Sequence, residues 1–355
     1  MQAVEKRISL FNSIAQSVIT NHDANFWLQK INPLWSLNQS LAKVVKKQTV
    51  AKDIVSLILQ CNRHVQRGAA GQHHPVTVEI AGRHYERTYS LMQLDADHLC
   101  LTVKKVDQGL VSSWLVEQAK VGDIVYLGQP YGDMQQHIQT PNLLLLAAGS
   151  GITPMLSLIE SLSQTKQFST TSVQLMYWVK TQADAAYAEY LKETAENFPH
   201  FSYQIFYTQE QDQRLNQSYV DQISALNETT VYACGPSGFV STAEKLFSCA
   251  ALLQTEAFSL SQFDVDASET GFINVRLTQS NKTVAIPKGQ SILSSLEHQG
   301  IKPNHGCRMG ICNKCACTKA QGSTKNLLNG SANHEPAQLL KICVNSAQSD
   351  LVIDL

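Results

Sequence analysis

The residues with the clearest chemistry are four cysteines near the C-terminus. Three follow the pattern C-x4-C-x2-C, and twenty-seven residues separate the third from the fourth; they are Cys307, Cys312, Cys315 and Cys343. This is the spacing of the four thiolates that bind a [2Fe–2S] cluster. Zinc sites commonly use paired C-x2-C ligands, so a zinc site or a set of free thiols is the weaker interpretation. The sequence therefore predicts an iron–sulfur cluster.

The loop that carries three of these cysteines resembles that of a plant-type ferredoxin. Gly306 and Gly310 let the backbone pass close to the iron without a side chain in the way. Asn313 stands between the second and third cysteines, where such ferredoxins commonly have glycine. Because asparagine tolerates positive φ better than most residues, we expect the loop to close despite this difference.

A second group of residues, Arg87-Thr88-Tyr89-Ser90, follows a segment of β-like sequence. It resembles the flavin-binding R-x-Y-S motif of the ferredoxin–NADP reductase superfamily. The resemblance implies that Arg87 neutralises the flavin pyrophosphate, that Tyr89 stacks on the isoalloxazine and that the Ser90 hydroxyl reaches N5, where the hydride arrives. Taken alone, the motif could equally be a surface turn.

Two further segments match the same family in the same order. Residues 101–106 resemble its second flavin-binding strand, and residues 109–115 resemble its G-x-V-S-x-x-L turn into a short helix, whose N-terminus favours phosphate. The resemblance implies FAD rather than FMN. The further flavin-binding residues that it implies are Thr102, Val103, Lys104, Gly109, Val111 and Ser112.

A glycine turn between a predicted buried strand and a predicted helix indicates a dinucleotide site. Residues 147–154 resemble the family's A-G-G-x-G-x-T-P loop, in which glycines let the backbone approach a pyrophosphate. Residues 232–238 resemble its C-G-P segment beside the nicotinamide. The implied residues are Gly149, Gly151, Thr153, Pro154, Cys234, Gly235 and Pro236. For Cys234 the alternative interpretation is a buried core cysteine.

Phe258 ends a Glu-Ala-Phe sequence that resembles the family's terminal E-x-F, whose aromatic ring covers the flavin and gives way to the nicotinamide. By this resemblance Ser90, Cys234 and Phe258 are the expected catalytic residues. Lys180 and Arg214 are expected at strand ends that face the 2′-phosphate of NADPH. Either could instead be a solvated surface charge, so NADPH is expected and NADH is the alternative.

The elements that must position these residues divide the 355-residue chain into several units. Its 43% hydrophobic and 16% charged residues are typical of a globular protein with more than one core. Short β-like segments predict an antiparallel barrel, and alternating strands and helices predict a doubly wound parallel sheet. The predicted units are a helical N-terminal extension (1–40), an FAD-binding β-barrel (41–137), an NAD(P)H-binding α/β domain (138–260), a linker (261–270) and an α+β, β-grasp-like [2Fe–2S] ferredoxin domain (271–355).

The N-terminal extension carries an aromatic patch of Phe26, Trp27 and Trp35. We expect a helical extension packed on the next domain, because basic residues are sparse around the patch. The alternative is a contact with a partner or a membrane surface.

Charge and hydropathy limit the partners. A net charge of −1 gives no sign of nucleic-acid binding, and the longest apolar run, residues 143–148, is too short to cross a bilayer. Without a signal peptide the expected location is cytoplasmic, with any contact at the inner membrane face made through a partner. Residues 271–355 contain nine Lys or Arg and four Asp or Glu, whereas residues 1–270 contain 19 and 25. These opposite signs suggest electrostatic docking of the two parts.

The order of the modules predicts the function. A nicotinamide gives two electrons as hydride, a cluster accepts one, and a flavin can connect the two. The resemblance, over residues 42–355, therefore implies an NAD(P)H-dependent reductase that passes electrons through FAD and the cluster to an external acceptor.

The acceptor is suggested by two short segments. Residues 306–312 and the Pro-x-Trp-Ser of residues 33–36 resemble those of bacterial NADPH oxidoreductases that supply membrane acyl-CoA desaturases. The leading hypothesis is therefore a di-iron fatty acyl-CoA desaturase or alkane hydroxylase as acceptor. The alternatives are a Rieske-type ring-hydroxylating or demethylating oxygenase, and, in another class, a redox-sensing binding protein.

Overall fold

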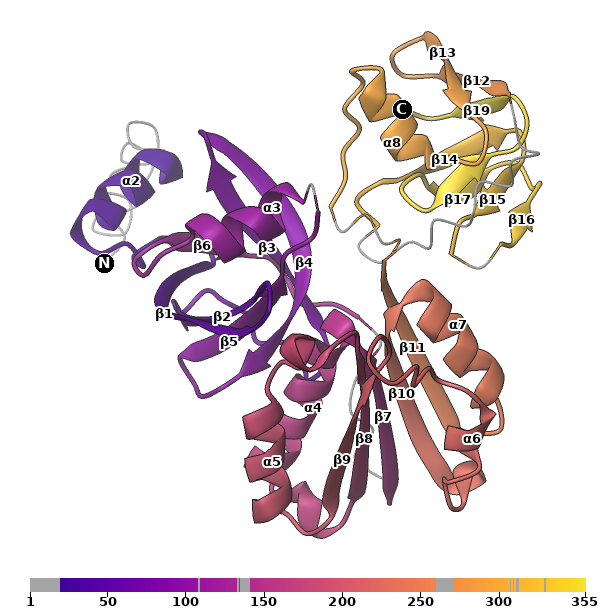
Figure 1. Cartoon of the computed structure of the whole chain (residues 1–355). Coiled ribbons are helices and arrows are strands. Elements are labelled where there is room, and N and C mark those ends of the chain that lie inside the picture. The colour runs from indigo at the N-terminus through magenta and orange to yellow at the C-terminus, as the bar shows by residue number, and fades with distance from the viewer. Residues whose placement is uncertain are drawn as a thin grey trace, which may run out of the picture.

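The computed structural model describes residues 20–107, 109–132, 134, 141–259, 271–306, 308, 310, 313–328 and 330–355. Within them a short helical segment precedes a β-barrel, an α/β domain and a C-terminal mixed α+β domain (Figure 1). The expected fold class is confirmed. Among the described residues, no helix combines the length and apolar character that a bilayer crossing requires.

Six antiparallel strands close into the barrel, in the order β1-β2-β5-β4-β3-β6. They are β1 (Leu41–Ala51), β2 (Ile54–Cys61), β3 (His73–Ile80), β4 (Arg83–Gln93), β5 (His98–Lys104) and β6 (Ile124–Leu127). Helix α3 (Leu110–Ser113) and a π-helical turn, η1 (Trp114–Gln118), join β5 to β6. Alternate side chains such as Leu57, Leu59 and Leu101 fill the interior, as period-2 strands require.

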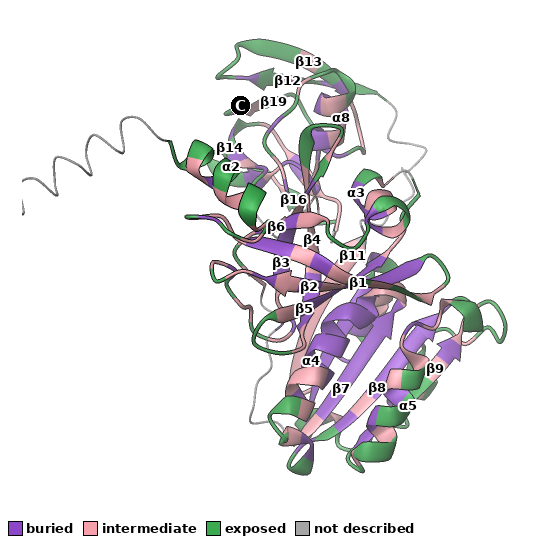
Figure 2. Ribbon diagram, turned by 90° about the vertical axis from the view of Figure 1, so that its left-hand side faces the viewer, coloured by how far each residue is buried: buried purple, intermediate pink, exposed green. Residues whose placement is uncertain are grey.

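The α/β domain has five parallel strands in the order β11-β10-β7-β8-β9. The strands are β7 (Asn142–Ala148), β8 (Ser172–Val179), β9 (Phe201–Tyr207), β10 (Thr229–Pro236) and β11 (Leu252–Ser259). The helices are α4 (Ile152–Gln164), α5 (Ala188–Asn197), α6 (Gln217–Val220) and α7 (Ser237–Leu246), with short 3-10 turns η2 (Gly149–Gly151), η3 (Gln167–Ser169), η4 (Gln182–Asp184) and η5 (Leu226–Glu228). Residues 143–148 are buried without interruption, because helices cover both faces of a parallel sheet (Figure 2).

The C-terminal domain packs helix α8 (Ile292–His298) against a mixed sheet of order β13-β12-β19-β14-β17. These strands are β12 (Phe272–Leu277), β13 (Lys282–Pro287), β14 (Ala316–Gln321), β17 (Gln338–Lys341) and β19 (Leu351–Ile353). A smaller sheet contains β15 (Thr324–Asn326), β16 (Ala332–Asn333) and β18 (Asn345–Ala347). The predicted linker, residues 261–270, lies outside the described residues.

The N-terminal extension contains helix α2 (Asn21–Ile31), which begins with a capping box between Thr20 and Asp23. Polar contacts attach the extension to the barrel: the Asn62 side-chain amide donates to the Leu34 carbonyl (3.1 Å) and the Gln39 carbonyl (2.9 Å). The extension thus contacts the next domain, as expected, but its aromatic patch is not covered by that contact. Phe26, Trp27 and Trp35 are 50%, 68% and 50% exposed, and hydrogen bonds from the barrel to the backbone of the extension hold the segment in place.

Candidate functional site

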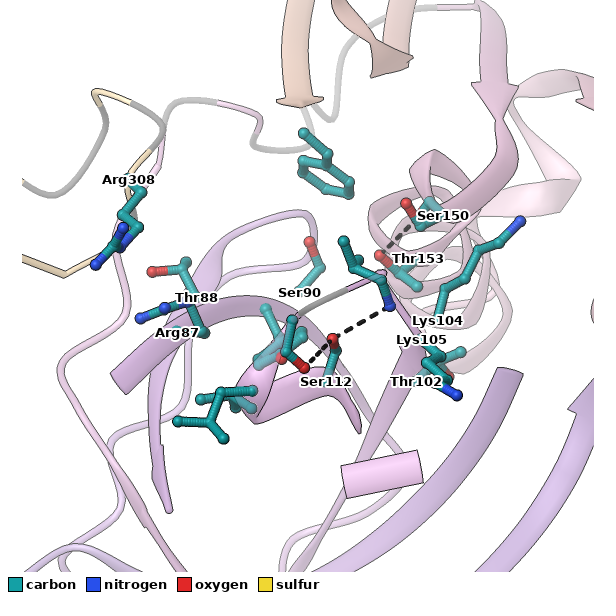
Figure 3. Close-up of a pocket in the computed structure, with 16 residues that line it drawn as sticks. Arg87, Thr88, Ser90, Thr102, Lys104, Lys105, Ser112, Ser150, Thr153 and Arg308 are labelled. Carbon is teal, nitrogen blue, oxygen red and sulfur yellow. Dashed lines mark hydrogen bonds between the residues drawn. The ribbon is translucent and has the colours of Figure 1, made fainter. Parts of the chain in front are cut away.

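A cavity of about 520 Å³ lies where the barrel meets the α/β domain (Figure 3). Strands β4 and β5, the turn into α3 and the start of α4 all contribute side chains. The sequence-predicted residues that line it are Arg87, Thr88, Tyr89, Ser90, Thr102, Lys104, Gly109, Val111, Ser112, Thr153 and Phe258. Segments that lie far apart in the sequence, from Arg87 to Phe258, therefore line the same cavity.

The predicted flavin motif forms one wall of this cavity. The Arg87 guanidinium donates from Nη1 to the Glu86 carbonyl at 2.6 Å, and the Thr88 hydroxyl lies 2.6 Å from the Tyr131 hydroxyl. Burial raises the pKa of Tyr89, so its ring stays neutral at physiological pH. An uncharged aromatic face beside a guanidinium is suited to a stacked ring and an anionic chain.

The turn before α3 is closed by Ser112. Its hydroxyl donates to the Gly109 carbonyl (3.1 Å) and accepts from the Val106 amide (3.2 Å). A Cβ on residue 109 would lie 2.5 Å from the Ser112 oxygen, which explains why the turn needs glycine. Val103 does not line the cavity: it is buried in the barrel core, because Thr102 and Lys104 take the opposite face of β5.

Sequence reasoning missed His73, which is almost fully buried behind Ser90. The Nδ1 atom of His73 lies 2.9 Å from the Ser90 hydroxyl, and its Nε2 atom lies 2.7 Å from the carboxylate of Glu256, on β11. A carboxylate can only accept, so in the neutral ring Nε2 donates to Glu256 and Nδ1 accepts from Ser90. Through the His73 ring, the Glu256 carboxylate of the α/β domain thus orients the Ser90 hydroxyl of the barrel.

A second cavity, of about 630 Å³, adjoins the first over the carboxyl ends of β7, β8 and β10. Its sequence-predicted lining residues are Lys104, Gly149, Lys180, Arg214, Pro236 and Phe258. Phe258 lines both cavities, as the resemblance leads one to expect of a ring between flavin and nicotinamide.

Other residues of the predicted nicotinamide loops, Gly151, Pro154, Cys234 and Gly235, are not among the lining residues of either cavity. A Cβ on residue 151 would lie 2.0 Å from the Cys234 carbonyl oxygen, so Gly151 lets the two loops touch. Cys234 is fully buried, and desolvation, with a smaller effect of Glu256, raises the pKa of its thiol. At neutral pH it is a thiol packed beneath the loops.

The predicted cluster loop is described only in part, because Cys307 and Cys312 lie outside the described residues. Cys315 and Cys343 are buried in the core of the C-terminal domain. Asn313 adopts a φ of 57°, as expected from its position, and the Lys341 ammonium donates to the Gly310 carbonyl at 2.6 Å. Two buried thiols beside a glycine-containing loop that Lys341 holds by a hydrogen bond fit an iron–sulfur cluster.

Comparison with known protein families agrees with this geometry. An oxidoreductase FAD-binding domain matches residues 41–136, an oxidoreductase NAD-binding domain residues 145–245, and a 2Fe-2S iron-sulfur cluster binding domain residues 275–345. An NADPH oxidoreductase of Mycobacterium tuberculosis (strain H37Rv) is 30% identical over 353 residues, which cover 96% of this chain and 91% of the relative. The chain therefore belongs to the ferredoxin–NADP reductase superfamily. The reductase uses FAD, a nicotinamide nucleotide and a [2Fe–2S] cluster as its cofactors.

Two further comparisons extend over most of the reductase. Phthalate dioxygenase reductase of Burkholderia cepacia is 24% identical over 331 residues, covering 88% of this chain and 96% of the relative. A solved structure of a phthalate dioxygenase reductase has the same fold, with a TM-score of 0.65, 24% identity and coverage of 89% of this chain and 97% of that one. The order of the three domains in this reductase is thus shared with a protein of known architecture.

The cavities of the reductase are arranged in sequence. The nicotinamide cavity shares Phe258 and Ser150 with the flavin cavity, and the flavin cavity has Arg308, from the cluster loop, at its other side (Figure 3). The two cavities and the described residues of the cluster loop thus follow one another across the domain boundaries.

Proposed function

We propose that this reductase takes electrons from NADPH and delivers them to a membrane-embedded di-iron oxygenase, either a fatty acyl-CoA desaturase or an alkane hydroxylase. The observation that carries this choice is the exposed aromatic surface of the N-terminal extension, formed by Phe26, Trp27, Ile31 and Trp35. Aromatic side chains of this kind favour the boundary between water and lipid, where a membrane-embedded acceptor would present its electron entry point.

The chain's own residues have distinct tasks in this proposal. Arg87 and the turn closed by Ser112 hold the anionic part of the flavin, and Tyr89 holds its ring. His73 fixes the direction of the Ser90 hydroxyl, and Phe258 keeps water from the reacting face until the nicotinamide displaces it. The bound flavin supplies the conversion of a two-electron donor into one-electron transfers.

NADPH is favoured over NADH by the cations of the second cavity. Lys180 and Arg214 both line it, and the Arg214 guanidinium pairs with the exposed Asp212 carboxylate, 3.5 Å away. An exposed pair of this kind is weak, so the guanidinium can turn to a 2′-phosphate at little cost. The name of the mycobacterial relative, an NADPH oxidoreductase, supports the same choice.

The second candidate is a reductase that serves a Rieske-type oxygenase. Its support is that relatives are named as the reductase of phthalate dioxygenase and as the electron transfer component of toluate 1,2-dioxygenase. Those matches cover 88% and 46% of this chain, less than the 96% covered by the NADPH oxidoreductase.

Reconstitution distinguishes these acceptors. The reductase is combined with NADPH and either a di-iron desaturase in lipid vesicles or a soluble Rieske oxygenase, and product is measured. We expect product only with the membrane enzyme, and expect Trp27→Ser to lower it while ferricyanide reduction is unchanged. Val121→Ser, which changes an exposed side chain of the barrel, is the matched control. Product with the Rieske enzyme alone would establish the alternative, and slow NADPH oxidation with every acceptor would favour a sensing protein.

A further inference from the structure

One ion pair joins the ferredoxin domain to the flavin-binding barrel. The Lys314 ammonium lies 2.6 Å and 2.7 Å from the two carboxylate oxygens of Glu86. Lys314 directly precedes the predicted cluster ligand Cys315, and Glu86 directly precedes Arg87 of the flavin motif. The pair therefore connects the two cofactor sites through their own binding segments, which are 228 residues apart in the chain.

Overall charge does not explain this contact. The excess of acidic over basic residues in the first 270 positions lies mainly in residues 138–260, which contain eleven Asp or Glu and five Lys or Arg. The barrel, residues 41–137, has nine acidic and eleven basic residues, so it does not attract the basic ferredoxin domain at long range. If the two parts dock electrostatically, as the sequence suggests, the attraction must come from individual charged side chains at the contact and not from the net charges of the domains.

A second contact reaches the flavin cavity from the same loop. Arg308, which has a φ of 60°, lines the cavity beside Arg87 and Thr88 (Figure 3). Its Nη2 atom lies 2.5 Å from Glu297, on α8, and 2.9 Å from His305. Arg308 is thus held by its own domain and reaches the cavity, and Lys314 supplies the direct link to the barrel.

We propose that the Glu86–Lys314 ion pair is a latch that positions the cluster loop over the flavin cavity, and that electron transfer from flavin to cluster depends on it. The side chains are 21% and 42% exposed, so water and salt compete with the contact. The latch consequently opens and closes rather than fixing the domains permanently. This inference holds whichever oxygenase accepts the electrons.

The first test detects the contact itself. A zero-length carbodiimide couples a carboxylate to an amine only when the two are in contact. Treatment of the holoenzyme, followed by mass spectrometry, should give a peptide pair joined through Glu86 and Lys314, and its yield should fall as sodium chloride is raised to 0.5 M. Absence of this product at low salt would overturn the proposal.

The second test measures transfer. Lys314→Glu should slow reduction of the cluster by about fivefold or more, with NADPH-to-ferricyanide activity unchanged, and Glu86→Lys combined with Lys314→Glu should restore most of the rate. Lys282→Glu makes the same charge change at an exposed position of β13 and should have no effect. If Lys314→Glu impairs cluster assembly, Lys314→Gln is measured with cluster content checked by visible absorption. A wild-type rate in the Lys314 variant, or no recovery in the double variant, would refute the latch.

Discussion

Replacing His73 by leucine tests whether the buried histidine orients Ser90. The change keeps a side chain of similar size but removes both hydrogen bonds, to the Ser90 hydroxyl at 2.9 Å and to the Glu256 carboxylate at 2.7 Å. If Ser90 contacts the flavin as proposed, its hydroxyl then loses the partner that sets its direction. The rate of flavin reduction should fall while the fold is retained.

The magnitude follows from the two bonds. The bond to a charged group is worth about 1.5–3 kcal/mol and the bond to a neutral hydroxyl about 1 kcal/mol, so we expect a loss of roughly 3 kcal/mol in the free energy of unfolding. A domain stability of about 5–15 kcal/mol tolerates this loss. Because a small displacement of a positioning group can cost up to about a hundredfold in rate, flavin reduction should slow by roughly ten- to a hundredfold.

The assay is stopped-flow reduction of the bound flavin by NADPH, followed at 450 nm, with flavin content and urea stability measured in parallel. His74→Leu is the matched control: His74 is the next residue of β3 and equally buried, but it contacts the Gln66 carbonyl (3.2 Å) and not Ser90. His73→Gln should recover part of the rate. Equal slowing in the His73→Leu and His74→Leu variants, or no slowing in either, would show that the His73 network does not orient the serine.

Four further predictions follow from single sites. Burial lowers the pKa of His74 to about 4, so between pH 4 and 6.5 the unfolded chain binds more protons than the folded protein. The free energy of unfolding should therefore fall by roughly 3 kcal/mol as the pH is lowered through this range. His74→Leu should remove this pH dependence from the midpoint of urea unfolding. Cys343→Ser should remove the visible absorption of the cluster, whereas Cys317→Ser, at another buried cysteine, should retain it. Gly151→Ala, whose Cβ would clash with the Cys234 carbonyl, should prevent NADPH binding or folding. Lys180→Ala should raise the KM for NADPH about tenfold but not that for NADH, and Lys192→Ala should change neither constant.

The parts of the structure that could be predicted from the sequence are those coded by local patterns. The cysteine spacing and the Arg-Thr-Tyr-Ser motif each lie within a few residues, and strand periodicity is visible over short windows. The same periodicity could have excluded Val103, because Thr102 and Lys104 face the cavity and adjacent residues of a strand point to opposite sides.

Residues that depend on contacts between distant segments could not be predicted. His73 has no motif of its own, and its partner Glu256 is 183 residues away. How the N-terminal extension attaches could not be predicted either, because the Asn62 side chain that binds the Leu34 and Gln39 carbonyls belongs to the barrel.

In the proposed mechanism both transfer steps take place at boundaries between domains. At the first boundary Glu256 and Phe258 from β11 meet His73 and the flavin cavity, and at the second Lys314 and Arg308 from the cluster loop meet the barrel. The first contact is buried and therefore insensitive to salt, whereas the second is partly exposed and sensitive to it. Raising the ionic strength should therefore slow cluster reduction more than flavin reduction by bound NADPH, because the Lys314–Glu86 pair is more exposed than Lys104–Asp184, the ion pair between the barrel and the α/β domain.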